Sequence, residues 1–386
     1  MTGGRTPFDL ADIIHAHRSD LEASQFLPAV QRRALSAITL CRTAALGGHQ
    51  NVCLDCGHEE EPTYNSCRNR NCPKCQGLAQ QRWIDARARA LLLIPHFHGV
   101  FTLPAELRPL ARKYPEAIYD VMFRCVAATL LEMGESRLGA TLGLTLVLHT
   151  WTRKLTYHPH IHVLITAGGL TPDGAAFNPV QENFLLHVKP LAALFKGKLM
   201  AALRDLRGQG VITMTDSAFG GLMARLKKLD WHVYLKEAFK SPEWVLEYLG
   251  RYTHRVGISN SRLLEVKPER VTFRTKGKGT ESVPPVEFLR RFVQHVLPPG
   301  FKKIRHAGLY ARPTALAQAK EHLGSRPALA PPEVSQEDGQ EASVQRDDHR
   351  CRSCDGLLFP KRIPRPSLPK QGTPTKLDSH AARSPP

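Results

Sequence analysis

The chain has 386 residues, enough for two or three structural units, and its 53 lysines and arginines against 35 acidic residues give a formal net charge of +18. This charge is typical of a protein that binds a polyanion, so nucleic acid is the first partner to consider, with a generally basic surface as the alternative. No apolar run reaches the roughly 18 to 20 residues that span a bilayer and no secretion signal opens the chain, so we expect a cytoplasmic protein whose nine cysteines bind metal or stay free.

Hydrophobic periodicity predicts alternating helices and strands. Apolar residues at helical spacing predict helices over residues 30–46, 78–94, 115–133, 190–206, 218–229 and 286–297. Short apolar or alternating runs predict strands over residues 96–103, 141–149, 158–166 and 231–235, and a hairpin over 262–266 and 270–275. The two types of element interleave without regular βαβ spacing, so we expect a mixed α+β core.

Three regions follow from these patterns. Residues 1–94 are predicted to form a helical and zinc-binding module, and residues 95–323 the main domain. From about Gly324 the composition shifts to Pro, Ser, Gln and charged residues, which bury too little apolar surface to offset the entropy of the chain. Residues 324–386 are therefore predicted to be a disordered, Pro-rich, basic tail.

Two Cys-x2-Cys pairs lie near the N-terminus, with fifteen residues between the pairs. This spacing is typical of a structural zinc site with four thiolate ligands, and ordinary buried or free cysteines are the alternative. The predicted ligands are Cys53, Cys56, Cys72 and Cys75. Cys67 and His58 are spare candidates. Because such a site has no open coordination position, we expect it to serve folding and DNA presentation.

A basic run accompanies the second pair and includes Arg68, Arg70 and Lys74. These side chains suit contact with DNA phosphates, and a solvated helix face is the alternative for each of them. Near the C-terminus, Cys351 and Cys354 form one more pair, but no second pair follows it. We treat this isolated pair as a candidate remnant of another zinc module.

Histidines alternate along the strand predicted over residues 158–166. His158, His160 and His162 therefore project from one face, where they can bind a divalent cation. If the preceding strand returns through a tight turn, His149 lies roughly opposite His158 on the same face, so His149 and His158 both remain candidates for a third ligand. Such a site suits Mg²⁺ or Mn²⁺ acting on a phosphate oxygen, although imidazole also suits Zn²⁺. A polar strand face without metal is the alternative.

A Ser-Pro-Glu start signal precedes a predicted helix on which Tyr248 and Tyr252 share one face. An aromatic stripe of the core is the alternative interpretation of these tyrosines. Beside a metal site in a basic protein, a phenol can attack a phosphodiester and form a covalent phosphotyrosine. Arg251 and Arg255 border the pair and suit phosphate contact, with ordinary surface charge as their alternative.

Several separated motifs in this order resemble the rolling-circle (HUH) transposases of the insertion-sequence ninety-one type. The resemblance extends from about residue 11 to residue 310. The motifs are RTAALGGH at 42–49, YNSCRNRNCPKCQ at 64–76, FTLP at 101–104, LHTW at 148–151, HPHIHVLI at 158–165 and YLGRYTHRVGISNSRLL at 248–264.

The resemblance implies an HUH endonuclease fold over residues 95–323, in which a central antiparallel sheet holds His160 and His162 as metal ligands and a nearby helix delivers a tyrosine. It implies that Tyr248 or Tyr252 attacks single-stranded DNA at an end of a mobile element. The products would be a 5′-phosphotyrosine and a free 3′-hydroxyl. The resemblance also implies a bacterial protein that associates with the nucleoid.

The sequence departs from the family pattern at two places. Asn71 stands where relatives commonly have histidine, and Thr152-Arg153 replaces a usual Gly-Gln, but neither change removes a predicted ligand or nucleophile. A plasmid replication initiator or a conjugative relaxase would use the same chemistry. A non-catalytic, zinc-stabilised DNA-binding derivative is the alternative from another class.

Overall fold

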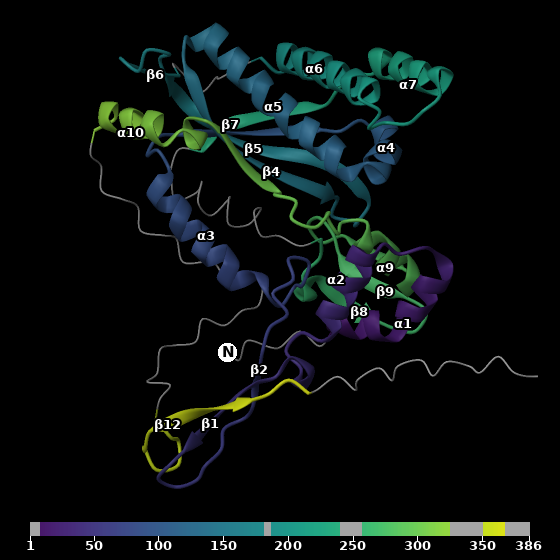
Figure 1. Ribbon diagram of the computed structural model, residues 1–386, viewed down its shortest axis with the longest axis vertical. Coiled ribbons are helices and arrows are strands. Elements are labelled where there is room, and N and C mark those ends of the chain that lie inside the picture. Colours follow the sequence, from purple (N-terminus) through teal and green to yellow (C-terminus); the bar gives the residue numbers. More distant parts are fainter. Residues whose placement is uncertain (1–7, 181–186, 240–256, 325–349, 367–386) are drawn as a thin grey trace, which may run out of the picture. The chain divides into compact units, whose positions relative to one another are not determined.

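The computed structural model describes residues 8–180, 187–239, 257–324 and 350–366, and the chain divides into two compact units (Figure 1). The larger unit comprises residues 1–39 and 68–342, and the smaller unit comprises residues 40–67 and 343–386. Both units are discontinuous in the sequence, so they do not coincide with the three predicted regions. Among the described residues, no helix combines the length and the apolar character needed to cross a membrane.

The larger unit contains most of the helices and strands. Its helices are α1 Leu10–Ser24, α2 Ala29–Thr39, α3 Gln76–Ala90, α4 Arg108–Lys113, α5 Pro115–Leu138, α6 Val188–Gly208, α7 Asp216–Lys228, α9 Pro285–Val293 and α10 Pro313–His322. Its strands are β3 His96–Thr102, β4 Thr141–Trp151, β5 Tyr157–Leu170, β6 Phe177–Pro179, β7 Val233–Phe239, β8 Leu263–Val266, β9 Val271–Arg274, β10 Thr280–Val283 and β11 Ile304–Gly308.

Local sequence signals explain where several of these helices begin and end. Asp9 precedes α1, and its side chain accepts a hydrogen bond from the Ala11 backbone N–H at 3.0 Å. Thr215 caps α7 in the same way. Helix α5 starts at Pro115 and ends at Gly139, which adopts a left-handed conformation that glycine tolerates best.

A fully antiparallel sheet forms the centre of the larger unit, with strand order β11-β4-β5-β3-β7 and β6 paired to β5. Strands β4 and β5 form a long hairpin that the sequence predicted at nearly the same positions. In the observed register, His149 lies opposite His160 rather than opposite His158. Two shifts account for this difference: the strands leave the turn with Trp151 opposite Tyr157, one position away from the predicted register, and an irregularity in the pairing between His149 and Trp151 adds one more.

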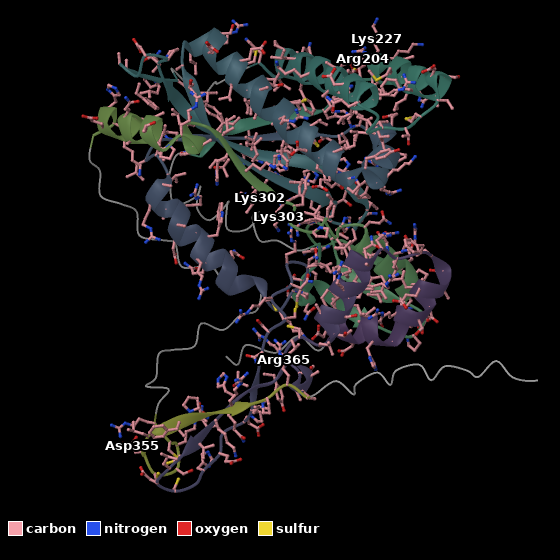
Figure 2. The ribbon with its side chains drawn as sticks, viewed as in Figure 1. Arg204, Lys227, Lys302, Lys303, Asp355 and Arg365 are labelled. Carbon is pink, nitrogen blue, oxygen red and sulfur yellow. The ribbon has the colours of Figure 1, made fainter. Side chains whose placement is uncertain are left out.

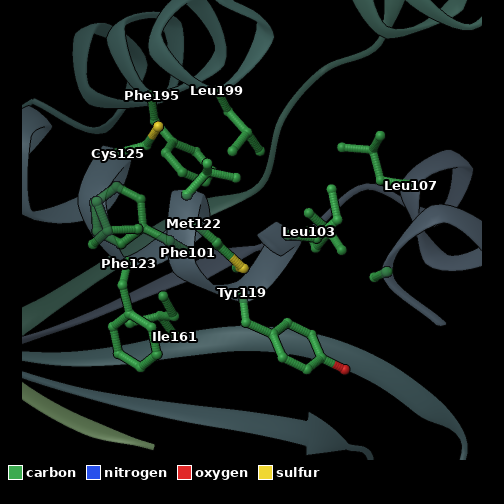
Figure 3. Close-up of a cluster of buried hydrophobic side chains, with 14 of the residues drawn as sticks. Phe101, Leu103, Leu107, Tyr119, Met122, Phe123, Cys125, Ile161, Phe195 and Leu199 are labelled. Atoms are coloured by element: carbon green, nitrogen blue, oxygen red, sulfur yellow. The ribbon is translucent and has the colours of Figure 1, made fainter. Parts of the chain in front are cut away.

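Helices α5 and α6 cover one face of this sheet (Figure 1). The core between them contains Phe101 from β3, Ile161 from β5, Met122 from α5 and Phe195 from α6, all nearly inaccessible to solvent (Figure 3). The rings of Phe101 and Phe195 meet edge to face with centroids 5.2 Å apart. Because side chains alternate along a strand, a buried Ile161 directs the even-numbered residues of β5 to the opposite face.

A second sheet in the larger unit has the strand order β10-β9-β8, and its first hairpin is the one that the sequence predicted. Phe273 of this sheet packs against Phe288 of α9 with ring centroids 5.6 Å apart. Arg262 is buried beside it and donates hydrogen bonds to the carbonyl oxygens of Gly257 and Arg274. Backbone oxygens thus satisfy a guanidinium that would otherwise be costly to bury.

The smaller unit contains β1 Gly48–Cys53, β2 Thr63–Tyr64 and β12 Leu358–Ile363 in one sheet of order β12-β1-β2. Strands β1 and β12 pair antiparallel from Gly48 opposite Ile363 to Cys53 opposite Leu358. The predicted disorder of residues 324–386 is therefore wrong for residues 350–366. This strand is ordered because its backbone pairs with β1 along its whole length.

Candidate metal centre

Three histidines gather on the sheet face opposite α5 and α6. His160 and His162 come from β5, and His149 comes from the neighbouring position on β4. One ring nitrogen from each lies within 4.8 Å of the others. The alternation of residues on β5 and the antiparallel register with β4 produce this convergence without any loop having to position a ligand.

A hydrogen bond orients His160, one of the two clustered histidines of β5. The Nδ1 atom of His160 lies 2.7 Å from the carbonyl oxygen of His158, to which it donates. This bond leaves Nε2 as the nitrogen with a free lone pair, and it lies 3.1 Å from Nε2 of His162. Both Nε2 atoms therefore point into the same space, as two ligands of one ion would.

A further histidine, His98 on β3, lies beside this cluster and was not predicted from the sequence. Its Nε2 atom lies 3.0 Å from Nδ1 of His162, and the two rings stack with centroids 5.3 Å apart. The signal was present in the alternation His96-Phe97-His98, which places two imidazoles on the face that β3 shares with the histidines of β5. His98 is thus placed to fix the orientation of the His162 ring through its Nδ1 atom.

His158 has a different environment from the other histidines of β5. Its Nδ1 atom lies 2.8 Å from a guanidinium nitrogen of Arg108, a residue that the sequence analysis did not single out. Burial lowers the pKa of His158, and the positive charge of Arg108 lowers that pKa further. Of the two candidates for a third ligand, the structure therefore brings His149, rather than His158, into the cluster.

Burial also favours the neutral form of His160 and of His98 beside the cluster. It lowers the pKa of His160 to about 4, although the hydrogen bond to the carbonyl oxygen of His158 acts in the opposite direction. The pKa of His98 is lowered to about 4, mainly by burial and then by the positive charge of Lys236. Since only a neutral imidazole has a lone pair to donate, His160 is ready to bind a metal at neutral pH. Three nitrogen donors leave further coordination positions open for oxygen ligands.

Comparisons with known proteins bear on what such a site does. A family model described as "Putative transposase" matches residues 143–317, which include the whole cluster of His149, His160 and His162. A model of the insertion-sequence ninety-one type described as "Transposase zinc-binding domain" matches residues 13–103.

Two curated relatives match most of the chain. The chain is 38% identical over 369 residues to "Putative transposase y4qJ" of Sinorhizobium fredii, covering 90% of this chain and 92% of that protein. It is 30% identical over 332 residues to "Transposase for insertion sequence element IS801" of Pseudomonas savastanoi pv. phaseolicola, covering 81% and 78%. The chain belongs to the transposase family of the insertion-sequence ninety-one type. No solved structure matches it.

The predicted nucleophiles of this transposase, Tyr248 and Tyr252, lie outside the described residues, and so do Arg251 and Arg255. Their sequence positions follow β7, which ends at Phe239. Their roles stay predictions from the sequence.

The basic residues near the second cysteine pair have internal contacts in this transposase. Arg70 donates a hydrogen bond to the carbonyl oxygen of Phe301 at 2.6 Å, and its partial burial lowers its pKa. Lys74 forms an ion pair with Asp9 at 2.6 Å. Arg68 is exposed in a left-handed backbone conformation. Of the three, the exposed Arg68 has the environment that best suits the predicted phosphate contact.

The cysteines of this transposase assemble differently from the expectation. Cys53 and Cys56 gather with Cys351 and Cys354, and their four sulfur atoms lie within 4.8 Å of one another. The spacing in the sequence had instead paired them with Cys72 and Cys75, which lie in the larger unit directly before α3. Sequence spacing alone could not reveal a partner pair almost 300 residues away, because only the pairing of β12 with β1 brings it close.

Proposed function

We propose that this transposase nicks and rejoins single-stranded DNA at the ends of its mobile element, as a rolling-circle enzyme with a tyrosine nucleophile. The observation that carries the proposal is the convergence of His149, His160 and His162 on one sheet face of a basic chain. Mg²⁺ or Mn²⁺ is the cation that we assign to this site, and single-stranded DNA at the element ends is the substrate.

In the proposed reaction, the phenolic oxygen of Tyr248 or Tyr252 attacks a phosphorus atom of the DNA backbone. The phenol loses its proton as a bond forms between its oxygen and phosphorus, the bond from phosphorus to the 3′-oxygen breaks, and the 3′-oxygen takes up a proton, so no proton is gained or lost overall. A divalent cation held by the three histidines would polarise a non-bridging phosphate oxygen and stabilise charge in the transition state.

The products are a 5′-phosphotyrosine and a DNA strand with a free 3′-hydroxyl. Attack of a 3′-hydroxyl on the phosphotyrosine reverses the step, so strands can be rejoined without an external energy source. Two tyrosines let one residue cleave a DNA strand while the other resolves the intermediate. Arg68, Arg251 and Arg255 are proposed to contact the DNA phosphates, which the net charge of +18 attracts.

The neutral state of His160 supports this chemistry. The low pKa of His160, about 4, prevents protonation from competing with the cation at neutral pH. The hydrogen bond from His160 to the carbonyl oxygen of His158 fixes the ring in the orientation that a ligand needs. In this proposal the histidines therefore bind and orient the cation, while the tyrosine forms the covalent bond to DNA.

The test uses single-stranded oligonucleotides that tile the DNA on both sides of the gene, incubated with the full chain and Mn²⁺. We expect a protein–DNA adduct that survives denaturation, and its loss in the variant Tyr248→Phe/Tyr252→Phe. His160→Ala should also abolish the adduct while leaving tightly bound zinc unchanged. His322→Ala, a histidine of α10 outside the cluster, is the matched control and should retain full activity.

Three outcomes would contradict the proposal or replace it. An adduct that persists in the double tyrosine variant rules out the assigned nucleophiles. Tight DNA binding without any adduct on any oligonucleotide identifies a non-catalytic DNA-binding derivative. When oligonucleotides from a plasmid origin and a transfer origin are also supplied, cleavage confined to these, with none at the element ends, identifies a replication initiator or a relaxase.

A further inference from the structure

We propose that Cys351 and Cys354 complete a four-thiolate zinc site with Cys53 and Cys56, so that a segment near the C-terminus is a structural half of the zinc module. The matched family regions, residues 13–103 and 143–317, contain only the first pair. The inference is independent of the DNA-cleavage chemistry. It concerns the smaller unit alone.

The first half of the site is a tight turn at the end of β1. The backbone N–H of Gly57 donates to the carbonyl oxygen of Cys53 at 3.0 Å, and the N–H of Cys53 donates to the carbonyl oxygen of His58 at 2.9 Å. A further bridge pairs Val52 with Glu59. Gly57 adopts φ +72°, a left-handed conformation that lets the chain fold back beneath the two sulfurs.

The second half repeats this geometry, with each hydrogen bond at the equivalent position of the turn. The N–H of Asp355 donates to the carbonyl oxygen of Cys351 at 2.9 Å, and the N–H of Cys351 donates to the carbonyl oxygen of Gly356 at 2.7 Å. Arg350 pairs with Leu357 as Val52 pairs with Glu59. Asp355, labelled in Figure 2, adopts φ +60° at the position equivalent to Gly57.

This repetition has a physical meaning. Two turns with unrelated sequences share the same hydrogen bonds and the same left-handed residue, and each presents a Cys-x2-Cys pair. In the second turn, the N–H of Ser353 also approaches the sulfur of Cys351 at 3.4 Å, as expected for a donor to a thiolate. Such paired turns are the way in which zinc ribbons bring four sulfurs to one ion.

The distances between the sulfur atoms fit a tetrahedral zinc ion. The sulfur of Cys53 lies 3.5 Å from that of Cys354, and the sulfur of Cys56 lies 3.7 Å from that of Cys351. With zinc–sulfur bonds of about 2.3 Å, the edge of the tetrahedron is about 3.8 Å. A disulfide needs a separation of about 2.05 Å, so these contacts are not disulfide bonds.

The smaller unit also needs such a cross-link. The buried apolar cluster of its described residues consists of two of the ligands, Cys53 and Cys351, together with Leu358. So small a cluster cannot offset the entropy of ordering the chain, and small units of this kind depend on a metal or a disulfide. The ion therefore joins the two turns and keeps β12 paired with β1.

The test measures zinc in the purified full chain. Cys351→Ser/Cys354→Ser should contain one zinc ion fewer per chain than the wild type, and so should Cys53→Ser/Cys56→Ser. The quadruple variant should lose no further zinc, because both pairs bind the same ion. Ser353→Ala, in the same turn, is the matched control and should retain the full zinc content, since its backbone N–H is unchanged.

Two further readouts keep the proposal falsifiable if a variant folds poorly. Cys354→His, which keeps a ligand at this position, should retain the zinc that Cys354→Ser loses. Trypsin should cleave the zinc-loaded wild type slowly at Arg352 and cleave it rapidly after chelation. The proposal is overturned if the zinc content of the Cys351→Ser/Cys354→Ser variant equals that of the wild type, or if the losses of the two double variants add in the quadruple variant.

Discussion

The ring of His162 depends on a partner outside the metal cluster. His98 on β3 is almost fully buried and lies 3.0 Å from Nδ1 of His162, so a hydrogen bond from Nδ1 leaves Nε2 facing His160. Partners of this kind fix the orientation of a metal-binding imidazole and raise its basicity. His98 is thus a positioning residue that acts through His162.

Replacing His98 should weaken the metal site without removing it. We expect His98→Ala to raise the Mn²⁺ concentration needed for half-maximal DNA adduct formation by about 10-fold to 100-fold. His98→Gln should recover part of this loss, because its amide oxygen can accept the hydrogen bond from His162. The measurement is a Mn²⁺ titration of adduct yield.

A purely structural role of His98 predicts a different result. In that case His98→Ala would lower the thermal unfolding temperature and the amount of active protein, but the Mn²⁺ concentration at half-maximal yield would not change. Such an outcome, with no rescue by glutamine, would contradict the positioning role.

At the scale of elements, the central sheet places the site, and its packing depends on a close contact at Gly99. This residue of β3 lies on the face that packs against α5 and α6, where an added Cβ atom would come 2.8 Å from Cγ1 of the buried Val163. Val163 is β-branched and confined in the core, so it has little freedom to move aside. Glycine is needed here for space rather than for backbone conformation.

The two alanine substitutions Gly99→Ala and Gly197→Ala should therefore have opposite effects. Gly99→Ala should lower the free energy of unfolding by about 1 to 3 kcal/mol through overpacking. Gly197 is exposed in α6 and has no atom within 4 Å of an added Cβ. Gly197→Ala should raise the free energy of unfolding by about 0.5 to 1 kcal/mol. Urea denaturation of both variants would measure the difference, and equal effects would contradict this packing account.

The sequence predicted the elements whose periodicity is strong. The long hairpin of β4 and β5 and the helix α5 were expected near their observed positions, because their apolar residues repeat at the period of the element. Helix α1 was not predicted, and neither was β12. Strand β12 owes its order to the backbone of β1, a long-range partner that no local pattern reveals.

The sequence predicted only those parts of the candidate site that a local pattern reveals. The alternation of His160 and His162 is visible locally, so their shared face could be inferred. The position of His149 depended on the register of the hairpin, which an irregularity near Trp151 shifts. The role of His98 depended on the pairing of β3 with β5, which joins residues more than 60 positions apart.

At the scale of the whole molecule, buried neutral histidines should make the larger unit sensitive to acid. His295 donates to the carbonyl oxygen of Leu155 and lies 3.2 Å from the hydroxyl of Thr150. Burial lowers the pKa of His295 to about 4, and burial likewise lowers the pKa of His306 to about 4. In the unfolded chain these groups titrate near pH 6.5.

The free energy of unfolding should therefore fall as the pH decreases from about 6.5 to about 4. In this window the unfolded chain binds protons that the folded chain excludes, so acid favours unfolding; above pH 6.5 the contribution is fully present. His295→Gln should show a shallower fall, by about 3 kcal/mol at most over the window. Urea denaturation at several pH values measures both slopes, and parallel curves for the wild type and the variant would contradict the assignment.

The central claim is that a tyrosine of this transposase becomes covalently joined to DNA. Digestion with trypsin places the two candidate tyrosines in different peptides. Cleavage after Lys240, Arg251 and Arg255 places Tyr248 in the peptide 241–251 and Tyr252 in the peptide 252–255. The decisive measurement is mass spectrometry of the tryptic peptides from the nuclease-trimmed adduct. We expect a nucleotide attached through its phosphate to one of these two peptides, and none when the adduct reaction is run with His160→Ala. A nucleotide on any other peptide, or labelling that persists in His160→Ala, would contradict the account.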